Sequence, residues 1–362
     1  MTPLESRGDG RRRVAVLGAT GAVGQTFIRL LVGHPWFELV EVAASERSAG
    51  KPYSEAAKWI GADDMPPSVA GMTVLACDPS QITADIVFSA LDSSVAGDAE
   101  PAFARAGKMV LTNAKNHRMA PDVPLVIAEV NPSHLRVLEA QRKGRGWTGG
   151  IVANGNCASI VAALPLAPIQ QKFGISKIIT MTMQAVSGAG YPGVPSLDIL
   201  GNVIPYIADE ESKVESEIQK FLGSIDAGGS AIRAGTFAVS AHTNRVAVEH
   251  GHTICLSVEL ETKADARAVE QAIRDWRGDE SARGLPSSPD RPIVVSDRPD
   301  RPQPRRQVDT GHGMTVVVGR VRPDPVFDVK LVAMGHNVIR GAAGASVLNA
   351  ELMLHCGLLG AS

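Results

Sequence analysis

The fold of this 362-residue chain is decided by Arg13-Val14-Ala15-Val16-Leu17-Gly18-Ala19-Thr20-Gly21-Ala22-Val23-Gly24. The first five residues form a short apolar, β-branched run that is typical of a buried strand. Glycines follow at a spacing of three, and residues 25–32 continue with apolar side chains at helical spacing. In such a turn glycines let a pyrophosphate approach the backbone, and the N–H groups at the helix start bind it. A tight turn without a ligand is the alternative, but the flanking strand and helix favour a dinucleotide site.

Residues 39–44 predict a second strand, and the turn that follows it bears on the choice of cofactor. At this place, about twenty residues past the glycine loop, an acidic side chain binds the ribose of NAD, whereas an arginine accommodates the 2′-phosphate of NADP. Glu46 and Arg47 are both present. Because Arg47 is flanked by Ser45 and Ser48, which add phosphate donors, we expect NADP.

Strands and helices alternate along the rest of the first half. Apolar runs at 73–75, 85–91 and 109–111 predict strands, and the alanine-rich segment 94–106 predicts a helix. This alternation favours a doubly wound parallel α/β sheet, in which ligands lie at the carboxyl ends of the strands. Asn113-Ala114-Lys115-Asn116 follows the last of these strands and is either an anion site or a solvated turn.

A single cysteine stands out in Asn154-Gly155-Asn156-Cys157-Ala158-Ser159-Ile160. It lies between a predicted strand at 151–153 and an apolar run at 160–169 that predicts a helix. The dipole at a helix N-terminus favours the thiolate, which is the nucleophilic form of cysteine. An inert buried cysteine is the commoner role, so the rest of the chain must decide between the two.

The second half has a different pattern, in which apolar and polar residues alternate along the strands. This pattern predicts a mixed or antiparallel sheet with one covered face, and the other face is available to another subunit. The predicted strands are 176–186, 237–240, 253–260 and 315–321, and the predicted helices are 210–222 and 264–276. Together with the first half, the chain is expected to be an α/β protein with a Rossmann-type domain and an α+β domain.

Two C-terminal segments complete the pattern. Residues 278–313 are rich in proline, arginine and aspartate, and a loop of this length is a functional flap, an interface arm or a disordered segment. The sequence is compatible with all three of these roles. Residues 341–359 predict a helix with an apolar face of small residues.

The composition excludes several classes of function. A formal net charge of −2 provides no field of one sign for nucleic acid or an anionic membrane. No apolar segment reaches the ~18 residues of a membrane span. The four cysteines are far apart, which argues against a disulfide framework and suits a reducing compartment. The polar, basic N-terminus is no secretory signal, and we expect residues 1–12 to be a disordered tail of a cytoplasmic protein.

A second cluster of polar residues runs from Asn244 to His252. Arg245 has the planar fork that binds a carboxylate, and a histidine beside a glycine turn carries protons near neutral pH. His250, His252 and Cys255 would be an alternative metal site, but no matching second ligand group lies nearby. Either histidine is otherwise structural, and for His250 we favour that interpretation.

In their order, these motifs resemble those of the aspartate-semialdehyde dehydrogenases, most closely the archaeal and fungal branch. The resemblance extends from Val14 to about Leu358. The motifs that carry it are the glycine loop, the turn at 45–48, the segment 113–116, Asn156-Cys157, the segment 184–190, Arg245, His252 and the segment 341–346.

The resemblance implies roles for the residues of a catalytic site. Cys157 would be the nucleophile that forms a thioacyl enzyme, and His252 would be the general acid/base. Gln184 would orient the thioacyl intermediate. Arg245 would clamp the carboxylate of the substrate, and Glu210 would bind its amino end.

The resemblance also implies two further binding sites. Inorganic phosphate would be bound by Lys115, Asn116 and Lys213. NADP would contact Gly18, Thr20, Gly21, Ala22, Val23, Ser45, Arg47, Ser48, Ser187, Gly188 and Asn337. No metal is expected.

The family's activity is the conversion of aspartyl phosphate to aspartate semialdehyde with NADPH, and its members are usually homodimers or homotetramers. The implied division of the chain is an NADP-binding domain at 13–153, a catalytic and dimerisation domain at 154–335 and a C-terminal helix at 336–362 that returns to the cofactor domain. A catalytically silent NADP-binding regulator on the same fold would not account for Cys157, Arg245 and His252 together.

The chain departs from the family pattern near both catalytic groups. Family members commonly have Asn-Pro-Asn-Cys-Ser-Thr where this chain has Gly155 and Ala158-Ser159, and they often have Pro at Ala247 and Asp at His250. A related enzyme for another semialdehyde or for an acyl-CoA, of the malonyl-CoA reductase kind, is therefore the alternative function.

Overall fold

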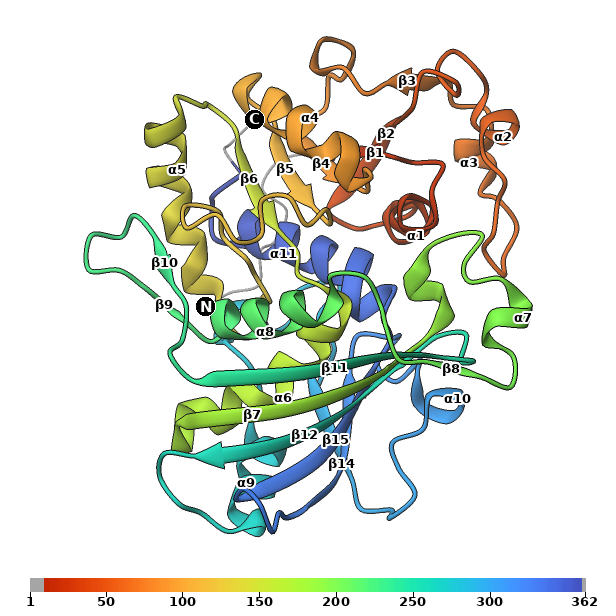
Figure 1. Cartoon of the computed structure of the whole chain (residues 1–362). Coiled ribbons are helices and arrows are strands. Elements are labelled where there is room, and N and C mark those ends of the chain that lie inside the picture. The colour runs from red at the N-terminus through yellow and green to blue at the C-terminus, as the bar shows by residue number, and fades with distance from the viewer. Residues whose placement is uncertain (1–9, 360–362) are drawn as a thin grey trace.

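The structure is a computed structural model that describes residues 10–359. The upper layer in Figure 1 is a sheet of six parallel strands in the order β3-β2-β1-β4-β5-β6. This order changes direction between β1 and β4, the switch point at which doubly wound sheets bind ligands, and it confirms the predicted Rossmann-type sheet. The strands are β1 (Arg12–Leu17), β2 (Phe37–Ala44), β3 (Val74–Ala76), β4 (Ile86–Ser89), β5 (Met109–Thr112) and β6 (Gly150–Ala153).

Each face of this sheet has its own hydrophobic core, because successive side chains of a strand point to opposite faces. Val14 and Val16 of β1 pack in one core with α1, α5 and α11, whereas Ala15 and Leu17 pack in the other with α4. Burial on both faces is typical of a parallel sheet. The helices are α1 (Ala22–Leu31), α4 (Ser93–Arg105), α5 (Val137–Arg145) and α11 (Gly344–His355), with the short α2 (Tyr53–Ala56) and α3 (Pro67–Ala70) between β2 and β3.

The lower layer is a mixed sheet of seven strands in the order β13-β14-β15-β12-β7-β11-β8, which confirms the predicted mixed sheet. The helices α6 and α9 pack on one face. On the other face, the side chains of Ile179 and Met181 of β7 are each 44% exposed. The strands are β7 (Ile175–Gln184), β8 (Val203–Ile204), β11 (Ala238–Val246), β12 (His252–Leu260), β13 (Ile293–Ser296), β14 (Val316–Pro323) and β15 (Val329–Gly335).

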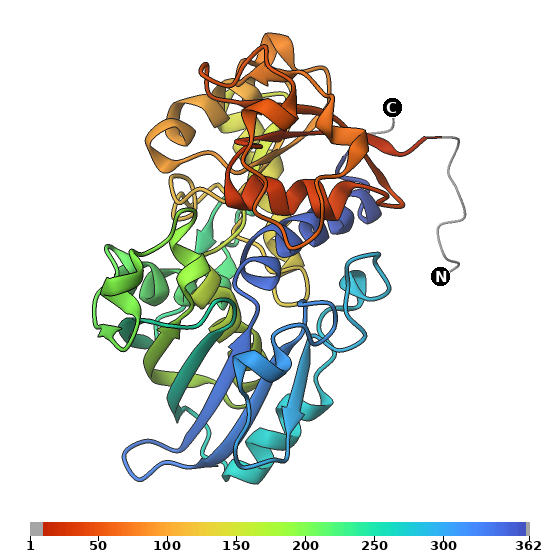
Figure 2. The same cartoon turned by 90° about the vertical axis from the view of Figure 1, so that its right-hand side faces the viewer.

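Two connections join the layers close to one point. The helix α6 (Cys157–Phe173) leads from β6 to the lower sheet, and the π-helical turn η5 (Ile339–Ala343) leads from β15 into α11. Figure 2 shows α11 returning beneath α1 of the upper layer, and these two helices are in contact. The helices of the lower layer are α7 (Ser196–Ile199), α8 (Glu210–Phe221), α9 (Ala266–Asp275) and α10 (Pro304–Gln307), and a separate hairpin consists of β9 (Ser224–Ile225) and β10 (Ile232–Arg233).

Several predicted boundaries are corrected by the structure. Of the expected N-terminal tail at 1–12, residues 1–9 lie outside the described residues, while Arg12 already begins β1. The segment 278–313 is structured and contributes the edge strand β13, which pairs with β14. The expected helix at 341–359 begins with the π turn of η5 and ends at His355. The strand expected at 237–240 continues to Val246, because its pairing with β7 extends to Arg245.

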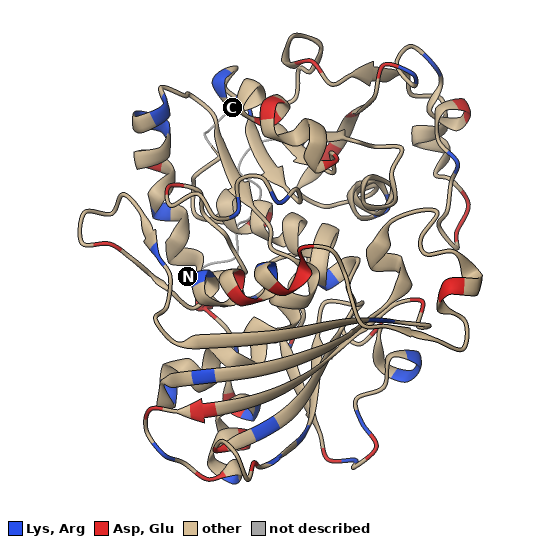
Figure 3. Cartoon of the chain, viewed as in Figure 1, with Lys and Arg blue, Asp and Glu red and all other residues tan. Residues whose placement is uncertain are grey.

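In the cartoon of Figure 3, Lys and Arg positions are interspersed with Asp and Glu positions along both layers. Among the residues that the structure describes, no helix is both long and apolar enough to cross a membrane.

Candidate active site

Cys157 is the first residue of α6, where the chain passes from the upper layer to the lower one. The side chain of Asn156 caps this helix, because its Oδ1 accepts hydrogen bonds from the N–H groups of Ala158 at 2.9 Å and Ser159 at 3.2 Å. Gly341 of η5 lies against the cysteine, and a Cβ at Gly341 would be 2.5 Å from the Cβ of Cys157. The nucleophile candidate is therefore held between a capped helix and a glycine.

Three neighbouring strands bring the other predicted catalytic side chains to Cys157. His252 begins β12, Gln184 ends β7, and Arg245 on β11 is the register partner of Gln184. The Nε2 of His252 lies 3.1 Å from the Sγ of Cys157. The Nη1 of Arg245 donates a hydrogen bond to the carbonyl of Ala185 at 2.8 Å. These side chains are buried on the face of the sheet that α6 covers, so the predicted residues form one cluster.

Burial dominates the protonation of the cysteine and histidine. It raises the pKa of Cys157 to about 12, with Glu210 contributing in the same direction, whereas Arg245 lowers this pKa. Burial also lowers the pKa of His252 to about 3, and Arg245 and His336 contribute in the same direction. The expected effect of the helix dipole, which favours the thiolate, is thus opposed at Cys157 by burial, which favours the protonated thiol.

Charged side chains at the start of α8 lie next to Asn156, the residue before Cys157. Glu210, the first residue of α8, accepts a hydrogen bond from the Nδ2 of Asn156 at 2.7 Å, and its second oxygen is 3.2 Å from the Nζ of Lys213. Lys115 pairs with Asp209 at 2.9 Å. Asn116 donates to the carbonyl of Ser93, at the start of α4. The two lysines thus lie near the N-terminus of α8.

The predicted cofactor loop has the geometry of a phosphate cradle. Gly18 has a φ of +71°, and a Cβ there would lie 2.5 Å from the carbonyl oxygen of Ala90. A Cβ on Gly24 would lie 2.3 Å from the carbonyl oxygen of Gly18. Both glycines are therefore required, and Thr20, Gly21, Ala22 and Val23 form the turn and the first residues of α1. Ser45, Arg47 and Ser48 follow β2, the neighbour of β1, where a ribose substituent would be bound.

Ser187, Gly188 and Asn337 contact the segment from His250 to His252. The Oγ of Ser187 accepts a hydrogen bond from the Nδ2 of Asn337 at 2.8 Å and lies 2.9 Å from the Nδ1 of His250. A Cβ on Gly188 would be 2.9 Å from the Nη1 of Arg245 and 3.1 Å from the Cε1 of His252. The backbone of Gly188 therefore lies so close to Arg245 and His252 that a side chain at this position would crowd both groups.

The helix α8 has a buried polar face that the sequence does not predict. Glu217, which is 1% exposed, accepts hydrogen bonds from the backbone N–H of Asn156 at 2.5 Å and from the Nη1 of Arg118 at 2.8 Å. Arg118 also donates to the carbonyl of Asn113 at 2.7 Å. One turn further along the helix, Lys220 donates to the carbonyls of residues 118, 120 and 123. Glu217 thereby ties the segment that carries Lys115 to the residue before Cys157.

We expect Glu217→Gln to lower kcat by about tenfold to a hundredfold, because charge-assisted hydrogen bonds are worth ~1.5–3 kcal/mol and the amide weakens the one that holds Asn156. The Michaelis constant for the cofactor should stay within about twofold, since the glycine loop is not touched. Steady-state kinetics checks this, with Ser216→Ala on the same helix as the control. A lower melting temperature with an unchanged kcat would show that Glu217 stabilises the fold without positioning the nucleophile.

Two of the departures from the family pattern, Gly155 and His250, have close neighbours in the structure. A Cβ at Gly155 would lie 2.3 Å from the Cζ of Phe221 and 3.1 Å from the Oε2 of Glu217, so these two side chains occupy the space that a larger residue at 155 would need. His250 stacks on His336 with ring centroids 4.9 Å apart. In the described residues, no group of three His, Cys, Asp or Glu side chains could hold a metal ion.

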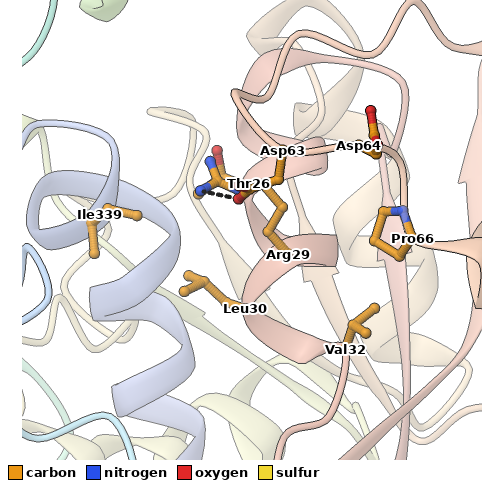
Figure 4. Close-up of a pocket in the computed structure, with 8 residues that line it drawn as sticks. All are labelled: Thr26, Arg29, Leu30, Val32, Asp63, Asp64, Pro66 and Ile339. Carbon is orange, nitrogen blue, oxygen red and sulfur yellow. Dashed lines mark ion pairs between the residues drawn. The ribbon is translucent and has the colours of Figure 1, made fainter.

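A further hollow lies away from this cluster, between α1 and the loop that contains Asp63. Figure 4 shows Ile339 and Leu30 on one side of it and Arg29 paired with Asp63, at 3.6 Å, on the other. None of the predicted catalytic side chains lines this hollow. We therefore look for the catalytic site in the Cys157 cluster and not in this hollow.

Comparison with known families agrees with this two-layer arrangement. Residues 13–138 match the family model of the semialdehyde dehydrogenase NAD-binding domain, and residues 166–340 match that of the semialdehyde dehydrogenase dimerisation domain. The fold and the cysteine–histidine pair thus define a semialdehyde dehydrogenase.

More specific relatives identify the family. The chain is 48% identical over 344 residues to an aspartate-semialdehyde dehydrogenase of Archaeoglobus fulgidus, covering 95% of this chain and 98% of the relative. It is 44% identical over 354 residues to that of Schizosaccharomyces pombe, with coverages of 96% and 99%. The crystal structure of the Candida albicans aspartate-semialdehyde dehydrogenase with NADP superimposes with a TM-score of 0.88 at 42% identity, covering 95% of this chain and 99% of that one. The chain belongs to the aspartate-semialdehyde dehydrogenase family.

Proposed function

We propose that the chain is an NADP-dependent aspartate-semialdehyde dehydrogenase that reduces L-aspartyl 4-phosphate to L-aspartate 4-semialdehyde through a thioacyl intermediate on Cys157. The observation that carries this proposal is the juxtaposition of Cys157, 3.1 Å from His252, with the cation Arg245 and the anion Glu210. A thiol beside a proton-carrying side chain supports covalent acyl transfer, which divides one difficult step into two.

Charge complementarity supports this substrate. The guanidinium of Arg245 would bind the α-carboxylate, and the carboxylate of Glu210 would bind the α-ammonium group. Gln184 would orient the thioacyl carbonyl from the end of β7. Lys115, Asn116 and Lys213 would bind the phosphate, once the anion displaces Asp209 from Lys115. The substrate would thus be held by its three charged ends.

The cofactor site is argued from the glycine loop. The N–H groups at the start of α1, where the N-cap Gly21 provides no side-chain cap, and the close approach that Gly18 and Gly24 allow suit a pyrophosphate. Ser45, Arg47 and Ser48 would bind the 2′-phosphate, which favours NADP over NAD. Ser187, Gly188 and Asn337 would line the nicotinamide end. When bound, NADPH supplies the hydride for the thioacyl carbon.

The proposal also covers the domains, the oligomeric state and the cellular compartment of the enzyme. Residues 13–153 would bind the cofactor, residues 154–335 would carry catalysis and subunit contacts, and 336–362 would return to the cofactor domain. The open face of the lower sheet, with Ile179 and Met181, supports a homodimer or homotetramer. We place the enzyme in the cytoplasm, in amino-acid biosynthesis.

The test is an assay of the purified protein with NADP, inorganic phosphate and a panel of semialdehydes, repeated with CoA in place of phosphate. We expect NADPH formation with aspartate semialdehyde that requires phosphate. NAD in place of NADP should support at most about a tenth of this rate. Activity that requires CoA and proceeds without phosphate would instead establish the acyl-CoA reductase alternative.

A further inference from the structure

The hydroxyl of Ser187 lies where the proposed cofactor must approach Cys157. Ser187 directly precedes Gly188, and a Cβ on Gly188 would be 3.1 Å from the Cε1 of His252, the ring whose Nε2 is 3.1 Å from the sulfur. A nicotinamide can pass hydride to a group on Cys157 only when its ring is in contact with that group. Ser187 is therefore a polar side chain at the nicotinamide end of the proposed cofactor site.

The first neighbour that determines the orientation of this hydroxyl is Asn337, which is 2% exposed. Its Oδ1 accepts a hydrogen bond from the backbone N–H of Gly251 at 2.9 Å. Because a backbone N–H can only donate, the amide nitrogen of Asn337 is the atom that faces Ser187. This Nδ2 donates to the Oγ of Ser187 at 2.8 Å. Asn337 thereby uses one lone pair of the hydroxyl and leaves its hydrogen free to be donated.

The second neighbour is His250, whose Nδ1 lies 2.9 Å from the Oγ of Ser187. The carboxylate of Glu249 lies 3.7 Å from the other ring nitrogen, Nε2, which favours a proton on Nε2 and a lone pair on Nδ1. The Nδ1 then accepts the hydrogen of the Ser187 hydroxyl. The ring of His250 is held in place by stacking on His336, with ring centroids 4.9 Å apart.

We propose that His250 is a positioning residue for the nicotinamide, because together with Asn337 it holds Ser187 as a hydrogen-bond acceptor for the carboxamide N–H of NADP. This inference rests on the proposed function and gives His250 a role beyond the structural one that the sequence favours. With Asn337 donating to it and His250 accepting from it, the Oγ of Ser187 has one free lone pair and no free hydrogen. It can accept from the carboxamide nitrogen and cannot donate to the carboxamide oxygen, so one orientation of this group is favoured.

The test is a calorimetric titration of the purified protein with two probes. These are NADP and 2′-phospho-ADP-ribose, which has the same pyrophosphate and 2′-phosphate but no nicotinamide. His250→Phe keeps a ring that can stack on His336 and removes the acceptor. We expect it to raise the Kd of NADP about threefold to tenfold, the scale of one uncharged hydrogen bond. The Kd of 2′-phospho-ADP-ribose should stay within about twofold, and an equal increase for both probes would overturn the proposal.

His250→Asp is the matched rescue variant. An aspartate oxygen is as many bonds away from the Cβ as the Nδ1 of histidine, so it can accept the same hydrogen bond although the ring stack is lost. We expect the Kd of NADP in this variant to stay within about twofold of the wild-type value. If His250→Asp and His250→Phe weaken NADP equally, the acceptor is not what matters at this position and the proposal fails.

A double-mutant cycle tests whether His250 acts through Ser187. In the Ser187→Ala background the group to be positioned is absent, so His250→Phe should change the Kd of NADP by less than about twofold. Independent losses that multiply in the double variant would contradict the proposal. These titrations need neither aspartate semialdehyde nor phosphate. A wild-type enzyme without phosphate-dependent turnover would therefore refute the proposed reaction, while the role of His250 is decided by the two probes alone.

Discussion

Cys157→Ala is expected to lower the turnover of aspartate semialdehyde by about a thousandfold or more, because the covalent intermediate cannot form without the sulfur nucleophile. The alanine keeps the first residue of α6 and the cap by Asn156, so the site should be intact except for the sulfur. Because the glycine loop is at the switch point of the other layer, the dissociation constant for NADP should change by no more than about threefold. Steady-state kinetics and a cofactor titration by fluorescence check the two halves of this prediction.

A second cysteine provides the matched control. Cys255 is also a partly buried free thiol and lies on β12, on the face of the lower sheet opposite to His252. Cys255→Ala should leave kcat within about twofold. Comparable turnover in the Cys157→Ala variant and the wild-type enzyme would remove Cys157 from the chemistry. A loss of activity in both variants would point to general damage by cavity formation instead.

The parts of the fold that the sequence predicts are those with local signals. Each of these signals depends only on residues a few positions apart in the chain. The structure has β1 at the predicted strand 13–17, α1 after the glycine loop and α6 at the apolar segment after Cys157. The order of the parallel sheet follows from the alternation of strands and helices. The segment 278–313 has no such local signal, because β13 is defined by its pairing with β14, about twenty residues further along the chain.

The buried face of α8 could not be predicted for a related reason. Glu210, Lys213, Glu217 and Lys220 recur at helical spacing, a pattern that usually marks a solvated helix face. Burial of this face depends on partners far away in sequence: Arg118, for example, precedes Glu217 by 99 residues. The protonation state of Cys157 could not be predicted for the same reason, because it depends on residues that are distant in sequence. The helix dipole is a local property that the sequence contains, whereas desolvation comes from the packing of three strands and η5 around the sulfur.

The largest effect of pH is expected on the alkylation of Cys157 in the unliganded enzyme. Only the thiolate reacts with iodoacetamide, and a pKa of about 12 means that the thiol is protonated at all lower pH values. The thiolate fraction therefore rises about tenfold per pH unit, and the rate constant should rise about a thousandfold from pH 6 to pH 9. Mass spectrometry of the Cys157 peptide after timed quenching measures this rate without interference from the other three cysteines.

The shape of this profile decides between two states of the cysteine–histidine pair. A thiolate paired with a protonated His252 would react at a nearly constant rate between the pKa values of the two groups, giving a plateau across pH 6–9. A neutral pair has no such plateau, because the pKa of His252, about 3, lies below this range and the pKa of Cys157 lies above it. Arg245 acts in the direction of the thiolate by lowering the pKa of Cys157. Arg245→Ala should therefore slow alkylation at every pH in this range while leaving the tenfold slope unchanged, and a plateau in either protein would show that the proton of Cys157 resides on His252.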